Sequence, residues 1–117
     1  MKTLIFGALL LCSFNLSAQN FLDSASAMDI IKDMRDDTSQ ELEITSDPVV
    51  YKQKKNNLKA YQVFENHLNG DHDVEYSVQM AVLEVMPLNI TVEQYENDDL
   101  EPELMRIKTH LISILTQ

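Results

Sequence analysis

Three histidines, His67, His72 and His110, are the side chains best suited to acid–base or metal chemistry in this chain. None of them stands beside a serine in a recognisable motif, and the Gly-x-Ser-x-Gly turn of serine hydrolases is absent. A serine or threonine nucleophile needs such an activating base. The sequence has only two glycines, which is too few for a glycine-rich phosphate loop. We therefore expect no catalytic residues and predict that the protein is not an enzyme.

An acidic stretch, Asp71-His72-Asp73-Val74-Glu75, resembles the start of a calcium-binding loop. The resemblance ends there, because Tyr76 occupies the position that requires glycine and Val82 the position of the closing glutamate. A zinc site would need three or four nitrogen or sulfur ligands close together. The methionines are scattered rather than clustered, which favours core packing over copper binding. The sequence therefore predicts neither a metal site nor a cofactor.

The strongest charge asymmetry is a group of four lysines within eight positions, Lys52, Lys54, Lys55 and Lys59. We regard these lysines as a possible interaction patch for an anionic ligand or an acidic surface. They could equally pair with acidic helices of the same protein, and the acidic composition favours this second interpretation. Exposed pairs of this kind contribute little stability.

The N-terminus has the three parts of an export signal. Lys2 gives a positive start, residues 3–14 form an apolar run, and small and polar residues follow up to Ala18. About 12 apolar residues are too few to span a bilayer, which takes roughly 20. A lipid anchor on Cys12 is disfavoured because Leu11 before it is not small. We predict a bacterial-type signal peptide over residues 1–18, a secreted or periplasmic location, and no transmembrane segment in the mature chain.

Removal of residues 1–18 would leave eight basic and nineteen acidic residues, a formal net charge of −11. Such a chain repels the phosphates of nucleic acids, so we expect no nucleic-acid partner. If there is a partner, we expect another envelope or secreted protein. The negative charge of the mature chain favours a basic partner over an acidic one. The remaining chain contains no cysteine, so no disulfide can brace it.

Glycine is scarce throughout, which argues against the many tight turns of an all-β domain. Apolar residues recur at three- and four-residue steps in a first helix from Ser24 to about Leu42, where Ser24 can cap the first turn and a restart at Thr38 is possible. Asp47-Pro48 predicts the start of a second helix, and Gly70 its end in a left-handed conformation. Its apolar stripe consists of Val50, Leu58, Tyr61, Phe64 and Leu68.

The segment 74–86 is ambiguous, because its apolar residues alternate as in a strand. A lone strand would leave its backbone groups unpaired, so we favour a largely buried helix. A capping box from Thr91 to Gln94 predicts a short helix, and Pro102 opens a last helix. The fold class we expect is all-α, a bundle of about four helices in a single domain over residues 19–117. The alternative is an α+β fold with residues 74–86 as a strand.

These observations favour an exported, non-enzymatic protein that acts by protein–protein binding, as an inhibitor, an immunity-type protein or an accessory protein of the envelope. The alternative hypothesis is a small-ligand or metal carrier of the periplasm. Two features would discriminate between them. An exposed apolar patch would favour the first, and a buried polar cluster or a ligand site would favour the second.

Overall fold

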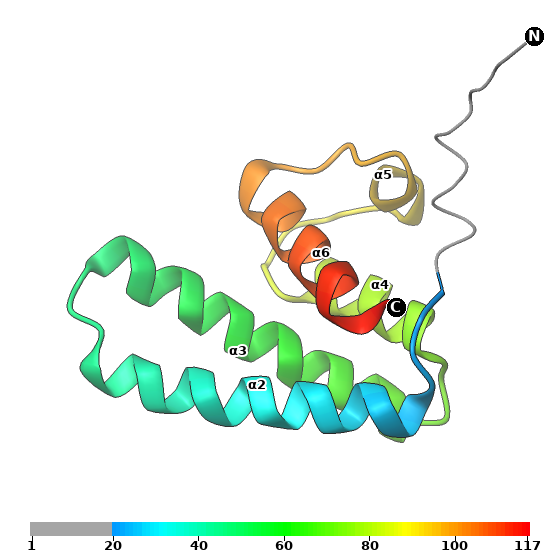
Figure 1. Cartoon of the computed structure of the whole chain (residues 1–117). Helices are drawn as coiled ribbons and strands as arrows, with labels where there is room; N and C mark the ends of the chain where they lie inside the picture. Colours follow the sequence, from blue (N-terminus) through cyan, green and yellow to red (C-terminus); the bar gives the residue numbers. More distant parts are fainter. Residues whose placement is uncertain (1–19) are drawn as a thin grey trace, which may run out of the picture.

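The computed structural model describes residues 20–117, and the expected signal peptide lies outside this range. The described chain is all-α, as predicted, with five helices and no named strand (Figure 1). None of these helices has the length and apolar character needed to cross a membrane. In chain order the helices are α2 (Ser24–Ile44), α3 (Pro48–Asn69), α4 (Val74–Glu84), α5 (Val92–Glu96) and α6 (Pro102–Leu115).

The ends of the helices follow local capping chemistry. Asp47 is the N-cap of α3, and Pro48 stands in its first turn, as predicted. Thr91 and Gln94 form the predicted capping box of α5. Helix α2 begins at Ser24, as predicted, but its N-cap is Asp23 rather than Ser24: the Asp23 carboxylate accepts the hydrogen bond from the Ser26 amide at 2.8 Å. A carboxylate satisfies an unpaired N–H at a helix start, which a serine hydroxyl does as well.

Two details of the expected helices are wrong. Gly70 caps α3 with φ −88°, and the left-handed conformation falls on the next residue, Asp71, with φ 70°. An aspartate tolerates this conformation better than most residues, because its short side chain bonds locally. The expected restart at Thr38 does not occur, because α2 runs unbroken and buries Thr38 against its neighbours.

The ambiguous segment is the helix α4, so the strand alternative is wrong. The buried residues of α4 recur at helical spacing, Val74, Ser77, Val78, Ala81 and Val82. Helix α4 packs against α3 on one side and α6 on another. These residues form one buried face, which includes the polar Ser77, whereas the opposite, less buried face carries the apolar Tyr76, Met80 and Leu83. This mixture explains why the sequence lacks the usual amphipathic pattern.

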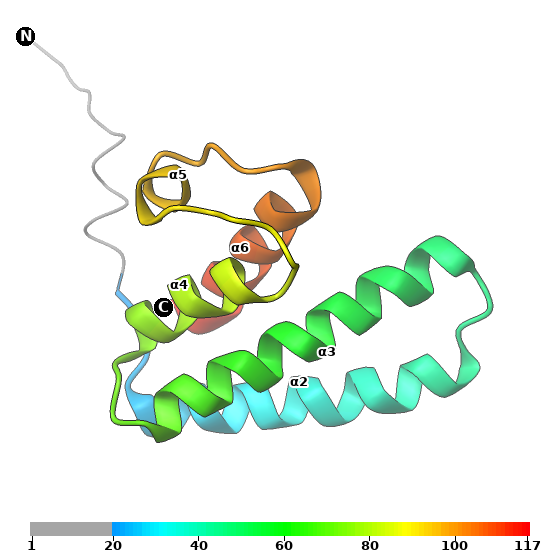
Figure 2. The same cartoon turned by 180° about the vertical axis from the view of Figure 1, so that it is seen from behind.

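The long helices α2 and α3 form an antiparallel hairpin, whose turn end projects beyond the other helices (Figures 1 and 2). Every buried residue of the described chain lies outside residues 39–59, which include this turn. We call residues 39–59 the arm and the remaining described residues the body. The body holds one core, whose largest fully buried side chains include Tyr61, Phe64, Ile31, Leu104, Ile107 and Leu111.

The two ends of the described chain are joined in the body. Phe21 and Thr116 form an isolated antiparallel bridge, and the Leu22 amide donates to the Leu115 carbonyl at 2.9 Å. The Gln117 amide donates to the Asn20 carbonyl at 3.0 Å. These bonds satisfy backbone groups at both ends and hold the start of α2 beside the end of α6.

Candidate functional site

Exposed apolar side chains gather at the turn end of the arm. Ile44 is 84 % exposed, Val49 66 %, Tyr51 40 % and Val50 39 %. These four are the majority of the seven large hydrophobic residues that are exposed in residues 20–117, and they occupy eight consecutive positions. Single exposed apolar residues are ordinary, whereas a local group of them marks a candidate contact surface. We call these four residues the arm tip.

Local hydrogen bonds fix the shape of the arm tip. The Asp47 carboxylate accepts from the amide of Val49 at 2.9 Å and from that of Val50 at 3.2 Å. The Thr45 hydroxyl donates to the Glu41 carbonyl at 2.6 Å, which satisfies a carbonyl at the end of α2. Both helix ends at the turn are therefore capped from within, and the apolar side chains are presented on an ordered turn.

The predicted lysine patch lies on the arm. One of its four lysines is paired within the described part of the chain, and the other three are not. The Lys54 ammonium forms an ion pair with Glu41 of α2 at 2.6 Å, which is the self-pairing that the sequence favoured. Lys52, Lys55 and Lys59 are exposed and form no ion pair with another described residue. The Lys55 nitrogen lies 6.0 Å from the centre of the Tyr51 ring, at the edge of the distance for a cation–π contact.

The charge of the arm differs from that of the body. The arm, residues 39–59, contains four lysines, all in α3, and three acidic residues, Glu41, Glu43 and Asp47. The body, residues 20–38 and 60–117, contains sixteen acidic residues and four basic ones. The arm tip therefore has a basic border on its α3 side, in a chain that is otherwise strongly acidic, and this side suits a partner with acidic groups around an apolar centre.

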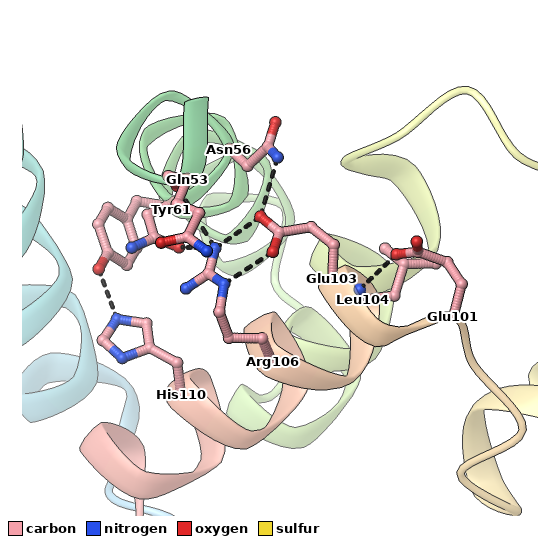
Figure 3. A network of polar contacts seen from close by, with 9 residues as sticks. Gln53, Asn56, Tyr61, Glu101, Glu103, Leu104, Arg106 and His110 are labelled. Atoms are coloured by element: carbon pink, nitrogen blue, oxygen red, sulfur yellow. Dashed lines mark hydrogen bonds and ion pairs between the residues drawn. The ribbon is translucent and has the colours of Figure 1, made fainter. Parts of the chain in front are cut away.

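A polar network joins the arm end of α3 to α6 (Figure 3). Arg106 forms a two-point pair with Glu103, with Nε–Oε1 and Nη2–Oε2 distances of 2.8 Å each. Arg106 also donates to the Asn57 side-chain oxygen at 2.9 Å, and Asn56 donates to Glu103 at 2.9 Å. The hydrogen bond from Arg106 lowers the pKa of Glu103 below its usual value. These groups satisfy one another across the two helices, as an interhelical brace does.

A tyrosine and a histidine extend the same interface toward the core. The Tyr61 hydroxyl oxygen and His110 Nε2 lie 2.6 Å apart (Figure 3). Burial, with a further contribution from the charge of Arg106, lowers the pKa of His110 below 6.5. Burial raises the pKa of Tyr61. Both groups are therefore neutral at pH 7, and their contact is a neutral hydrogen bond between α3 and α6 rather than an ion pair.

In the acidic turn between α3 and α4, Asp73 and His72 form contacts that stabilise the helix ends. The Asp73 carboxylate accepts from the Tyr76 amide at 2.7 Å and caps α4. The His72 ring lies 4.4 Å from that of Tyr76, and His67 Nε2 lies 3.2 Å from a Glu84 oxygen. Within residues 20–117, no group of three or more His, Cys, Asp or Glu side chains is arranged to hold a metal ion.

Comparisons with known proteins found no match to this chain among protein-family models, curated proteins or solved structures. The geometry described above is therefore the basis for the functional argument.

Neither the arm tip nor the polar network between α3 and α6 was predicted from the sequence. A signal for the tip was present, because Val49, Val50 and Tyr51 are consecutive and cannot all face one side of a helix. The pair Glu103 and Arg106 stands at a spacing of three, which is typical of contacts on one helix face. Nothing in the sequence indicated that these two side chains would meet α3.

Proposed function

We propose that this protein is an exported, non-enzymatic protein that acts by binding another protein through its arm tip, Ile44, Val49, Val50 and Tyr51. One observation carries the proposal: the arm has no buried residue, yet its end presents four large apolar side chains. Apolar side chains that fold no core are costly to leave in water, at roughly 25 cal/mol for each Å². A partner that covers them would recover this free energy.

The chemistry of the arm supports a particular kind of partner. Tyrosine is enriched at the centres of protein interfaces, and Tyr51 stands next to the aliphatic residues of the tip. Lys52, Lys55 and Lys59 follow the tip along α3, so the partner we propose has an apolar groove with carboxylates on its rim. This proposal differs from the basic partner expected from the net charge of the mature chain, because most of that charge lies in the body.

Identification of a partner tests this proposal. The mature protein is immobilised and exposed to the native envelope fraction, and retained proteins are identified by mass spectrometry. The candidate is then purified and its dissociation constant measured by calorimetry. We expect the double variant Ile44→Ser plus Val49→Ser to bind at least about tenfold more weakly, which corresponds to 1.4 kcal/mol.

The matched control is Leu88→Ser, which alters an exposed apolar residue of the body that is 43 % exposed. This control should bind like the wild type. A partner that binds the arm variant as tightly as the wild type would contradict the proposed contact surface.

Export is tested separately, by the intact mass of the protein recovered outside the cytoplasm. We expect a chain that begins near Gln19. A mass that retains residues 1–18, or a lipid on Cys12, would contradict the proposed export of a soluble mature domain.

A further inference from the structure

The body contains an open cleft at the end far from the arm turn, with a volume of about 540 Å³. This volume falls in the range of clefts that bind small organic molecules. The N-terminal segment, α4, α5, the loop after α5 and α6 all contribute to its walls. Its lining residues include Glu75, Tyr95, Glu96, Asp98, Met105, Lys108 and Ile112.

The ammonium group of Lys108 lines this cleft and is bound by neighbouring groups of the protein. The Lys108 nitrogen lies 2.6 Å from an Asp98 carboxylate oxygen and 2.5 Å from the Tyr95 carbonyl. It also lies 4.0 Å from the centre of the Tyr95 ring. Lys108 and Asp98 therefore neutralise each other. The contact shows that the surroundings of Tyr95 accommodate an amine cation.

Two further carboxylates line the cleft, and neither has a cationic neighbour in contact. Glu75 and Glu96 are exposed and form no ion pair or side-chain hydrogen bond with any residue in 20–117. The cleft therefore carries two uncompensated negative charges beside its apolar walls. Such a cleft favours a cation over an anion of the same shape.

The Tyr95 side chain provides a second and independent observation. Tyr95 lines the cleft and is only 9 % exposed, and its hydroxyl forms no hydrogen bond within the described part of the chain. Buried polar groups in proteins nearly always have a partner. Burial raises the pKa of Tyr95, and the charges of Glu75 and Asp98 raise it further. The hydroxyl thus stays protonated, and its lone pairs remain able to accept a hydrogen bond.

We propose that this cleft binds a small organic ammonium ion that carries an apolar chain. Glu75 and Glu96 attract the ammonium group, the Tyr95 hydroxyl accepts a hydrogen bond from it, and the apolar chain lies against Met105 and Ile112. This site is separate from the arm tip and does not depend on the proposed protein partner.

Three probes with the same six-carbon chain test the proposal: hexylammonium, hexanoate and hexanol. Each is titrated into the isotope-labelled mature protein at low salt, and binding is followed by heteronuclear NMR. We expect saturable shifts at the cleft residues with hexylammonium, and affinity at least about tenfold weaker with hexanoate. Hexanol should lie between the two. Added salt should weaken hexylammonium binding and leave hexanol unchanged.

Variants assign the contacts. Glu75→Gln plus Glu96→Gln should weaken hexylammonium binding about tenfold and leave hexanol binding unchanged. Tyr95→Phe, which keeps the ring, should weaken hexylammonium binding by a smaller factor of about three. The matched control, Asp37→Asn plus Glu43→Gln, removes two exposed carboxylates of α2 and should change nothing. Each variant is first checked for a native spectrum.

Several outcomes would overturn the proposal. They are the absence of saturable hexylammonium binding, equal binding of hexanoate, and shifts confined to residues outside the cleft. Unchanged hexylammonium affinity in the double glutamine variant would do so too. Tighter binding of hexanol than of hexylammonium would indicate a purely apolar cleft and would also overturn it.

Discussion

The arm and the body are made from the same two helices, yet they are stabilised differently. In the body, α2 and α3 bury Ala27, Ile31, Phe64 and Leu68 against α4 and each other. In the arm, residues 39–59, the same helices continue with no buried side chain. They depend on caps, backbone hydrogen bonds, an exposed ion pair and, at Asn56 and Asn57, the polar network with α6. A helix without a buried face receives little stability from tertiary packing.

This difference separates the residues that fold the chain from those that are free to bind. Substitutions in the body should act first on stability. Substitutions at the arm tip should leave stability nearly unchanged and act on association. The contrast also predicts faster amide exchange in the arm, because local opening needs the least free energy where few apolar contacts are lost.

The largest expected difference concerns two members of the same apolar stripe of α3. Phe64 is fully buried, whereas Leu58, which the stripe also predicted to face the core, is only half-buried in the arm. Phe64→Ala should lower the free energy of unfolding by about 3–5 kcal/mol, and Leu58→Ala by about 1 kcal/mol. Urea denaturation measures both. Equal losses would abolish the distinction between arm and body.

Two ion pairs between α2 and α3 provide the next comparison. Arg35 donates to both oxygens of Glu65 at 2.7 and 2.9 Å, and the Glu65 side chain is only 11 % exposed. In the arm pair, Lys54 with Glu41, the carboxylate side chain is 52 % exposed. Arg35→Met leaves a largely buried carboxylate unpaired and should cost about 1–3 kcal/mol. Lys54→Met should cost less than about 1 kcal/mol.

These two methionine variants are compared in the same denaturation series, at low and at moderate salt. Salt should reduce the effect of the arm pair more than that of the body pair. If Lys54→Met proved the more harmful, the arm would be stabilised by contacts that its exposure does not reveal.

A smaller effect is expected from pH on the interface between α3 and α6. The pKa of His110 is lowered below 6.5 by burial and then by Arg106, so the unfolded chain binds a proton near pH 6.5 while the folded chain does not. Stability should therefore fall as the pH decreases from about 6.5 towards the lower folded pKa. His110→Gln should flatten this slope in denaturation curves measured between pH 7 and pH 5.

Glu103 contributes in a different pH window. Its pKa is lowered below 4.5, chiefly by the hydrogen bond from Arg106, so its stabilising contribution is lost only as the pH falls below that value.

A stability profile that is level from pH 7 to pH 5 in the wild type would contradict the assigned role of His110.

The smallest effect on stability is expected at the arm tip itself. Val49→Ser changes a side chain that is 66 % exposed, so the free energy of unfolding should shift by less than about 0.5 kcal/mol. Val78→Ser, the matched change at a fully buried position of α4, should cost several times more. A loss above 1 kcal/mol at Val49 would show that the tip supports the fold.

The sequence predicted features that depend on a few neighbouring residues. Asp47 with Pro48, and Thr91 with Gln94, define helix starts because capping needs only the residues of one turn. The helical period likewise identified the buried face of α2. The sequence could not separate Phe64 from Leu58, because a period gives the direction of a face and not what lies opposite it.

Other features depend on the whole fold. The segment of α4 was ambiguous because apolar residues, Tyr76, Met80 and Leu83, also occupy the less buried face of the helix and obscure its helical period. Lys54 and Lys52 have the same chemistry and nearly the same position, yet only Lys54 meets a carboxylate across the hairpin. Tyr95, the residue on which the proposed cleft depends most, gave no local signal, because its surroundings come from α4, α5 and α6.

The bridge between Phe21 and Thr116 has a consequence for the order of events in folding. A chain that is made, or threaded through a membrane, from its N-terminus delivers Phe21 long before Thr116. The α2–α3 hairpin consists of residues 24–69, so its contacts can form before residue 116 arrives. The contact between Phe21 and Thr116 must wait for that residue, and contacts between residues distant in sequence form slowly. Deleting residues 116 and 117 should therefore leave the hairpin intact. It should remove the bridge to Phe21 and the hydrogen bond to the Asn20 carbonyl, which hold the segment before α2 in place.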